Sequence, residues 1–241
     1  LDKLLIDQYI MQGGKVLWLV DGIKASMDSL QNNLGSFVAT KNFLNIDDQL
    51  FRYGLRINSN LIQDLRSNKI PVITGYSNNV PQQSYFNWPY SPLLFSDSKH
   101  VISNGLDAIK CEFVSSIDTI KNNIHKTILL HSSNKSRLIP SPSKISLGIL
   151  ENPPLLTSYN KKFLPIAILL EGEFESLFKD KLVQKNNKIK FIKKSASNKM
   201  IVVSDGDLIA NDISKSGVIY PLGYDKNINF TFNGNKHFLI N

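Results

Sequence analysis

Four segments of the chain share one hydrophobic pattern, a run of consecutive apolar residues that ends at Gly, Ser or an acidic residue. They are GGKVLWLVDG (13–22), KTILLHSS (126–133), PIAILLEG (165–172) and KMIVVSDGD (199–207). Apolar runs of this length are typical of strands that are covered on both faces, as in a parallel sheet. A fifth run, SKISLGILEN (143–152), alternates more and indicates an edge or antiparallel strand.

Two further segments have the spacing of an amphipathic helix. In LDKLLIDQYIMQGG (1–14), Leu1, Leu4, Leu5 and Tyr9 lie on one apolar face, and the Gly pair provides a C-cap. In GEFESLFKDKL (172–182), the apolar residues fall on one helical face, with glutamates early and lysines late, as the helix dipole prefers. Because strand, helix and strand follow one another, the sequence predicts an α/β fold, with a layered, mostly parallel sheet flanked by helices.

The middle of the chain departs from this pattern. Residues 75–100 are rich in Pro, Asn, Ser and aromatic residues and show no steady period. Because Trp88 and Tyr90 need burial, we predict an ordered excursion with short strands there, and not a flexible linker. We therefore expect residues 1–241 to form one α/β region, in which 75–125 is an irregular insertion or the boundary between two lobes.

Length and composition define the broad class of protein. With 241 residues, 42% of them hydrophobic, the chain is able to bury a full core. No run approaches the roughly 20 apolar residues of a membrane span, and no signal peptide is visible. The chain opens inside an amphipathic helix, which we interpret as the mark of a fragment whose targeting or membrane segments lie outside it.

The formal net charge of +8 raises the question of an anionic partner. The positive residues are nearly all Lys and are scattered, with the densest groups at Lys185–Lys194 and Lys161–Lys162. Nucleic-acid surfaces add Arg and stacking aromatic residues to a basic stripe, and neither accompanies these lysines. We therefore expect a solvated, Lys-rich surface and no nucleic-acid partner.

Cysteine and histidine give no sign of a metal or thiol centre. The single cysteine, Cys111, excludes an intramolecular disulfide and a Cys-based zinc cluster. In IKCEFVSSI (109–117) it lies between charged residues, which predicts a strand with a buried core thiol and not a nucleophile in a sharp turn. The four histidines are far apart and lack ligand spacing. We expect no metal and no cofactor.

The strongest candidate chemistry lies in IVVSDGDLIAND (201–212), where an apolar run meets Asp205, Gly206 and Asp207. At the C-terminal end of a parallel strand, these residues would line the crevice where α/β folds bind ligands. One interpretation is a phosphoryl-transfer site, with Asp205 as nucleophile or Mg²⁺ ligand and Asp207 as acid–base partner. The other is structural: Gly206 takes an unusual backbone conformation and Asp207 caps the next turn. We favour the structural interpretation, because such triplets are common at strand-to-helix turns.

Four more residues are candidates for ligand binding. Asp21 and Glu171 follow other apolar runs, so we expect them at equivalent strand ends. Trp88, with a neighbouring Tyr, could stack on a sugar or peptide, although the prolines beside it are equally typical of a rigid, packed turn. Arg56 could line a solute-binding cleft near Trp88, or it could pair with an internal carboxylate.

Five longer phrases carry a resemblance to a known family. They are IDQYIMQGGKVLWLVDG (6–22), LFRYGLRIN (50–58), NWPYSPLL (87–94), AILLEGEFES (167–176) and VVSDGDLIAND (202–212). Together with the closing segment, PLGYDKNINFTFNGNKHFLIN, they resemble the GldG family of gliding-motility-associated ABC transporter components, which is described as substrate-binding-protein-like. The resemblance spans essentially the whole chain.

The resemblance implies a non-catalytic extracytoplasmic region of a membrane-anchored protein, on the periplasmic side of the inner membrane. Its partners would be an ABC permease subunit and a cytoplasmic ATPase, with other envelope motility proteins, in bacteria that glide. The implied fold is the glutamine-amidotransferase-like α/β domain shared with some intraflagellar-transport proteins. Enzymes of that superfamily carry a Cys in a strand-to-helix elbow. Cys111 stands in a different context, so amidotransferase activity is not expected.

Two function classes follow from these observations. The first is a scaffold or binding module that couples an ABC transporter to envelope machinery. The alternative is a metal-dependent phosphoryl or glycosyl transfer enzyme that uses Asp205-Gly206-Asp207, with Asp21 and Glu171 at other strand ends. No G-x-S-x-G elbow, phosphate-binding loop or dinucleotide fingerprint supports an enzyme of another kind.

Overall fold

The four long apolar runs form one sheet, in the order β1 (Val16–Leu19), β14 (Lys194–Val203), β13 (Pro165–Glu175) and β10 (His125–His131). All four predicted strands are therefore confirmed. β1 and β14 run parallel, whereas β13 is antiparallel to both of its neighbours. The mostly parallel arrangement is wrong, because an apolar run shows that both faces of a strand are covered and carries no information on its direction.

The structure is a computed structural model that describes residues 1–96, 99–180, 191–214 and 216–241. Outside the main sheet, the described strands pair only in antiparallel fashion. Two-stranded sheets are formed by β11 (Ser136–Pro140) with β5 (Asn60–Asp64), β4 (Leu55–Ile57) with β9 (Ile117–Thr119), and β15 (Tyr224–Asp225) with β16 (Phe230–Thr231). Three-stranded sheets are formed by β12 (Ser143–Ser146), β3 (Ser36–Lys41) and β2 (Ile23–Lys24), and by β6 (Ser67–Ser77), β7 (Val80–Leu94) and β8 (Ile109–Lys110). The position of β12 confirms the edge strand predicted in 143–152.

Helices are short in the described residues. They are α1 (Asp2–Met11), α2 (Met27–Asn32), α3 (Asp47–Tyr53) and α4 (Asn233–Ile240), with single 3-10 turns η1 (Leu147–Ile149), η2 (Leu156–Ser158) and η3 (Asp207–Ile209). The protein is therefore built mostly of strands in several small, mostly antiparallel sheets. The expected layered α/β fold of the glutamine-amidotransferase type is wrong. Of the helices in the described ranges, none has the length and apolar character to cross a membrane.

The helix predicted over 172–182 is also wrong as far as the structure describes it. β13 continues to Glu175, and Phe174 is fully buried between the more exposed side chains of Glu173 and Glu175. Burial therefore alternates with the period of two that is typical of a strand. Over a few residues this period is difficult to distinguish from the spacing of apolar residues on one face of a helix. The last two residues of the predicted helix, 181 and 182, lie outside the described residues.

Helix α1 is confirmed, but the opposite face from the predicted one is buried. Its C-terminal end is the expected glycine cap: the N–H groups of Gly13 and Gly14 bind the carbonyls of Ile10 and Tyr9. Leu1, Leu5 and Tyr9 are exposed and Leu4 is half-buried, whereas Asp7, Gln8, Ile10 and Met11 are buried. The polar pair faces inward because it holds other backbone segments.

Asp7 and Gln8 bind the two segments that flank the connection from β13 to β14. The carboxylate of Asp7 accepts hydrogen bonds from the N–H of Leu177 (2.9 Å) and the hydroxyl of Ser176 (2.6 Å). Gln8 exchanges two hydrogen bonds with the backbone of Ile192, at 2.7 and 3.1 Å. Helix α1 is therefore joined to the main sheet by polar contacts as well as by apolar packing.

The main sheet is covered on both faces, as the apolar runs require. Along β13, Ile168 and Leu170 belong to a core cluster that includes residues of α1 and α3. Ala167 and Leu169 belong to a second cluster, which includes Phe238 of α4. From Ala167 to Leu170 successive residues alternate between the two clusters, and Ile166 also belongs to the second, so the five apolar residues 166–170 are all buried.

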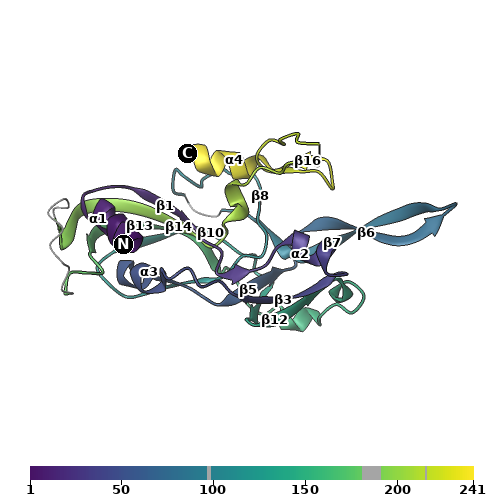
Figure 1. The fold of residues 1–241 in the computed structure, drawn as a ribbon, viewed down its shortest axis with the longest axis horizontal. Helices are drawn as coiled ribbons and strands as arrows, with labels where there is room; N and C mark the ends of the chain where they lie inside the picture. Colours follow the sequence, from purple (N-terminus) through teal and green to yellow (C-terminus); the bar gives the residue numbers. More distant parts are fainter. Residues whose placement is uncertain (97–98, 181–190, 215) are drawn as a thin grey trace.

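The predicted excursion is a long hairpin formed by β6 and β7. Its turn lies at Asn78 and Asn79, which both have positive φ, as a tight hairpin turn requires. Figure 1 shows the hairpin projecting from one end of the molecule. The burial of Trp88 and Tyr90 is confirmed, because both lie in a third core cluster at its base. The strands are long, not short, because much of the hairpin extends beyond the core.

Candidate functional site

The C-terminal ends of β1 and β14 meet at one edge of the main sheet, because these two strands are parallel. Asp21 follows β1, and the triplet Asp205-Gly206-Asp207 follows β14. Oδ1 of Asp21 accepts a hydrogen bond of 2.7 Å from the backbone N–H of Gly206, across 185 residues of sequence. The structure thus brings together two of the acidic segments that the sequence singled out.

Position 206 requires Gly because a side chain has no room there, and not because the backbone conformation is unusual. Its φ of −77° and ψ of −28° lie in the ordinary helical region, so the predicted unusual conformation is wrong. A Cβ atom at this position would lie 2.5 Å from Oδ2 of Asp21. A side chain would therefore displace the Asp21 carboxylate from the backbone that it binds.

Asp205, and not Asp207, caps the turn after β14. Asp205 is fully buried; its Oδ1 accepts a 2.8 Å hydrogen bond from the N–H of Asp207, and its Oδ2 a 3.1 Å bond from the N–H of Glu112. The thiol of Cys111 also donates to this carboxylate. The N-cap residue of η3 is Gly206, and Asp207 is the first residue of the turn, so the predicted capping role of Asp207 is wrong. Both oxygens of Asp205 are engaged by the protein itself.

The burial of this group changes its protonation. Burial raises the pKa of Asp205 to about 7; the carboxylates of Asp21 and Asp207 act in the same direction, while the bonds from Cys111 and Glu112 oppose the shift. Burial, and then the charge of Asp205, raises the pKa of the Cys111 thiol well above its ordinary value. A thiol that stays protonated is a poor nucleophile, so Cys111 acts as a buried hydrogen-bond donor.

A cleft of about 340 Å³ lies beside the triplet, lined by acidic side chains that include Glu112, Asp207, Asp212 and Asp225. Glu112 and Asp225 are bridged by the ammonium group of Lys110, at 3.1 and 2.9 Å. Burial lowers the pKa of Lys110, but the two carboxylates outweigh it and raise the pKa above its ordinary value. Lys110 therefore keeps its charge over the physiological range of pH, whereas burial raises the pKa of Glu112 above its ordinary value even though Lys110 opposes the shift.

Asp225 is further fixed from its own side of the cleft. Its Oδ2 accepts a 2.6 Å hydrogen bond from Nδ2 of Asn68, and its Oδ1 accepts one of 2.9 Å from the N–H of Asn227. Burial raises its pKa, but Lys110 and these donors outweigh the effect and hold the pKa below its ordinary value. This carboxylate is committed to internal contacts.

Helix α4 closes the other side of the cleft through Asn235, which sequence analysis did not single out. Its side chain accepts a 2.9 Å bond from the N–H of Lys110 and donates a 2.8 Å bond to the carbonyl of the same residue. The side-chain amide thus binds the backbone N–H and carbonyl of Lys110 as the backbone of a neighbouring strand would. Gly234 permits the close approach, because a Cβ there would lie 2.3 Å from the carbonyl oxygen of Asp107. No signal in the sequence distinguishes this Asn from others in an Asn-rich chain.

Glu171 is not part of this site. It pairs in register with Lys199, and the two side chains form a 2.6 Å ion pair. The hydrogen bond from Lys199 lowers the pKa of Glu171. β13 runs antiparallel to β14, and Ala167 pairs with Val203 at the end of β14. Glu171 therefore lies four residues, or roughly 13 Å, from the edge that carries Asp205.

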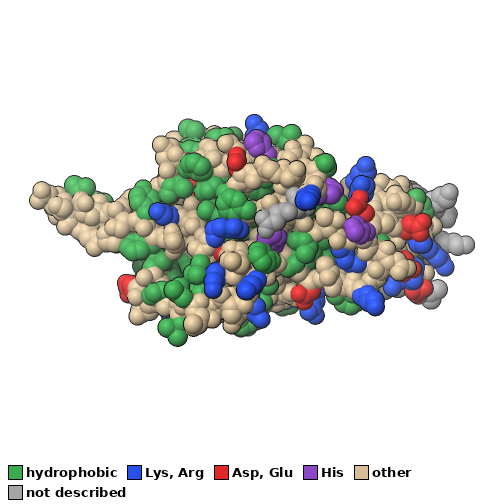
Figure 2. Space-filling view, turned by 180° about the vertical axis from the view of Figure 1, so that it is seen from behind, with side chains coloured by type: hydrophobic (Ala, Val, Ile, Leu, Met, Phe, Trp, Pro, Cys, Tyr) green, Lys and Arg blue, Asp and Glu red, His purple; other side chains and the backbone are tan. Residues whose placement is uncertain are grey.

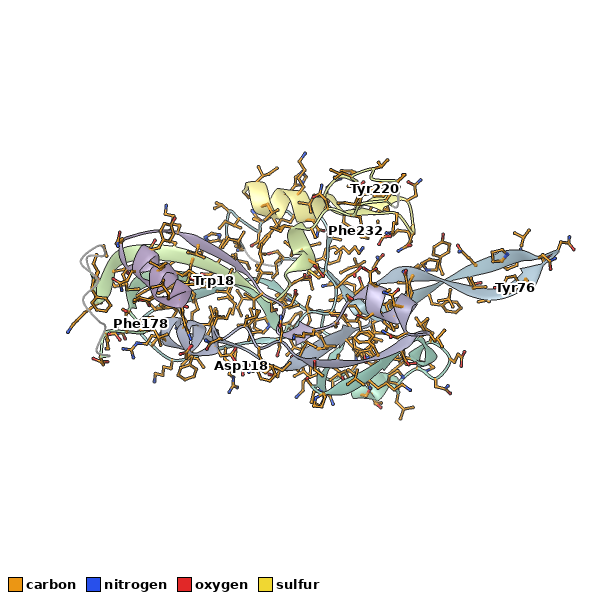
Figure 3. The ribbon with its side chains drawn as sticks, viewed as in Figure 1. Trp18, Tyr76, Asp118, Phe178, Tyr220 and Phe232 are labelled. Carbon is orange, nitrogen blue, oxygen red and sulfur yellow. The ribbon has the colours of Figure 1, made fainter. Side chains whose placement is uncertain are left out.

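Trp88 and Arg56 are separate from the acidic edge and do not form a common cleft. Trp88 is fully buried, and its ring packs 5.2 Å from that of Tyr90, so neither face is open to a ligand. Arg56 lies on β4 and forms a 2.6 Å ion pair with Asp118 on β9, both exposed. Pairing with a carboxylate was one of the two interpretations of Arg56, although this partner lies on the surface (Figure 3).

The described residues contain no group of three or more His, Cys, Asp or Glu side chains arranged to hold a metal ion. Asp21 and Asp205 bind backbone N–H groups of the turn after β14 and of Glu112, and the carboxylates of Glu112 and Asp225 both contact Lys110. The arrangement is suited to holding three segments of chain together: the turn after β14, the strand β8 and the C-terminal region.

The fold and this site define a β-rich protein in which buried carboxylates fix the chain's own turns. The family model ABC_transp_aux, described as an ABC-type uncharacterized transport system, matches residues 1–241. The chain belongs to this family, and it is an auxiliary component of an ABC-type transport system that associates with other transporter subunits. No curated protein matches the chain.

Proposed function

We propose that this chain is a non-catalytic scaffold or binding module on the periplasmic side of the inner membrane, joined to an ABC permease subunit and through it to a cytoplasmic ATPase. The family supports the association with a transport system. The observation that supports the non-catalytic role is the use of Asp205: this carboxylate is fully buried, and each of its oxygens accepts a hydrogen bond from the protein's own backbone.

A role in gliding motility rests on the likeness of long segments, such as NWPYSPLL (87–94) and VVSDGDLIAND (202–212), to the GldG family. In this role the chain would couple the transporter to other proteins of the envelope. Two residues of these segments, Trp88 and Asp205, are fully buried.

The scaffold role predicts that the fold of the acidic edge matters and that its exposed carboxylate does not. Asp205→Ala leaves three donors without an acceptor, whereas Asp207→Ala removes an exposed side chain that caps no turn. In cells that contain the whole transport system, Asp205→Ala should reduce co-purification of the permease and ATPase, and Asp207→Ala should leave it at the wild-type level. In a gliding bacterium, spreading of the cells should follow the same order.

The same pair of variants separates the scaffold from the metal-dependent enzyme. An enzyme that uses both aspartates would lose metal binding with either substitution. A specific Mg²⁺ or Mn²⁺ ion should then stabilise the wild type by roughly 2.7 kcal/mol at 100 times its Kd. We expect no shift of Tm across a panel of divalent metals. A shift that Asp207→Ala abolishes would reject the scaffold proposal.

A further inference from the structure

The outer part of the β6–β7 hairpin, residues 70–87, extends from the body of the protein (Figure 1), and only Ile70 at its base is a core residue that also lines the acidic cleft. We refer to residues 70–87 as the arm. The sequence from 70 to 96 contains no Asp, Glu, Lys, Arg or His, in a chain of net charge +8. Figure 2 shows the outer arm as hydrophobic and uncharged groups, while Lys and Arg side chains spread over the body. Charge on a surface normally prevents association, and the arm lacks it.

Large apolar side chains of the arm are open to solvent. The most exposed are Ile73 (51%), Tyr76 (71%), Val80 (58%) and Tyr85 (51%). Figure 3 shows Tyr76 near the far end of the arm. Because Tyr85 pairs with Pro71, and Ile73 is two residues further along β6, the side chains of Ile73 and Tyr85 are diagonal neighbours on one face of the ribbon.

The strand edges of the arm are also open. Over residues 70–87, the backbone hydrogen bonds present in the described structure join β6 and β7 only to each other. The β7 side is approached by the C-terminal region, since the hydroxyl of Tyr85 donates a 3.0 Å bond to the carbonyl of Asn227. On the β6 side, the run from Val72 to Ser77 has neither a charged residue nor a proline to block another strand.

We propose that the open edges of β6 from two copies of this chain pair with each other, so that the protein forms a twofold-symmetric dimer through its arms. A twofold axis brings the same surface of both copies together, so the uncharged edge of one copy meets that of the other. Ile73 of each copy then contacts apolar side chains of the second copy. Backbone donors and acceptors that now face water would join a four-stranded ribbon.

The net positive charge of the protein does not oppose this dimer. Eight residues of strand, 70–77, span roughly 26 Å. Antiparallel arms therefore hold the two bodies apart by more than the Debye length of about 8 Å at physiological ionic strength. Contact through any surface of the body would instead bring scattered lysines of both copies close together.

The composition of the tip favours a protein partner over lipid. Asn78 and Asn79 form the turn, and Gln82 and Gln83 follow on β7. Insertion of these amides into hydrocarbon would leave their donors and acceptors without partners. In a strand pairing they remain in water or bind across the ribbon.

Sedimentation equilibrium of the whole chain, from micromolar to submillimolar concentration, tests the dimer. We expect a monomer–dimer equilibrium in which Ile73→Glu raises the dissociation constant by about tenfold or more, because like charges meet across the axis. Val101→Glu is the matched control: Val101 is 78% exposed in a turn of the body, and its substitution should change nothing. Circular dichroism and Tm of each variant report whether the fold is retained.

Spin labels locate the contact. Cys111 is buried, so a label attaches to a Thr74→Cys or Val101→Cys variant at the new residue alone. We expect a short intermolecular distance from the label at position 74 and a long one from the label at 101. Three results would overturn the proposal: a monomer at every concentration, a dimer that Ile73→Glu leaves intact, or a monomer that binds vesicles of phosphatidylcholine and phosphatidylglycerol through Ile73. The test is independent of the proposed function, which rests on Asp205.

Discussion

The hydroxyl of Tyr53 donates a 2.9 Å hydrogen bond to the carboxylate of Asp7, and both side chains are fully buried. Burial, together with the charge of Asp7, raises the pKa of Tyr53 above its ordinary value, so the phenol stays protonated and keeps donating. The bond joins α1 to α3. With the two bonds from residues 176 and 177, it makes Asp7 the polar centre of this end of the protein.

Removal of this centre should destabilise the protein severely. Asp7→Ala leaves several buried donors without an acceptor, so we expect a loss of at least about 3 kcal/mol in the free energy of unfolding. Tyr53→Phe removes two bonds, because the hydroxyl also accepts one of 3.0 Å from Gln49, and it should lose about 1–3 kcal/mol. Urea titration measures both. Asp2→Ala, an exposed acidic residue in the first turn of the same helix, should change the stability by less than about 0.5 kcal/mol. Equal losses from Asp2→Ala and Asp7→Ala would contradict this account.

Gly206 should not tolerate a side chain while Asp21 is present. Gly206→Ala places a methyl group 2.5 Å from the Asp21 carboxylate, and we expect a loss of about 1–3 kcal/mol in stability. In an Asp21→Ala background the methyl group has room, so the same substitution should have a smaller effect. A double-mutant cycle measures this coupling. Gly75→Ala is a suitable control, because a Cβ at that position would meet no atom within 4 Å. Strictly additive losses would argue against the close contact.

The raised pKa of Asp205 makes stability depend on pH. Because the folded-state pKa of about 7 lies above the ordinary value of 3.8, the contribution is fully present below pH 4 and is lost as the pH rises through 7. The slope can reach about 1.4 kcal/mol per pH unit between these limits. Asp205→Asn removes the titration. The difference in unfolding free energy between wild type and variant should therefore shrink from pH 4 to pH 7.5. A difference that is constant over this range would exclude a raised pKa.

Asn235 should be needed for the attachment of the C-terminal region. Asn235→Asp keeps an acceptor for the N–H of Lys110 but cannot donate to the carbonyls of Lys110 and Leu208, so we expect a loss of about 1–3 kcal/mol. Hydrogen exchange should quicken at Lys110 before it does in β13. Its exposed neighbour serves as the control: Lys236→Ala should leave exchange at Lys110 unchanged.

The sequence predicts strands better than it predicts their arrangement. The runs at 13–22, 126–133, 165–172 and 199–207 are strands because burial of both faces leaves a direct mark on composition. Strand direction leaves no such mark on composition, although it determines which acidic residues come together. Asp21 binds Gly206 because β1 and β14 are parallel, whereas Glu171 lies away from them because β13 is antiparallel to β14.

Buried polar residues were the second source of error. The apolar face of α1 suggested that Leu1, Leu5 and Tyr9 pack inward, but Asp7 and Gln8 are buried in their place. Helical spacing counts apolar residues and cannot recognise a carboxylate that binds backbone and hydroxyl groups of residues 176 and 177. The same holds for Asn235, whose partner, Lys110, is 125 residues away.

The contacts of α1 have a mechanical consequence. Gln8 binds the backbone of Ile192 and Asp7 that of Leu177, so a pull on the helix would load several hydrogen bonds at once on both sides of the β13–β14 connection. A force applied to α1 would therefore act directly on β13 and β14, and the helix and the sheet would unfold together.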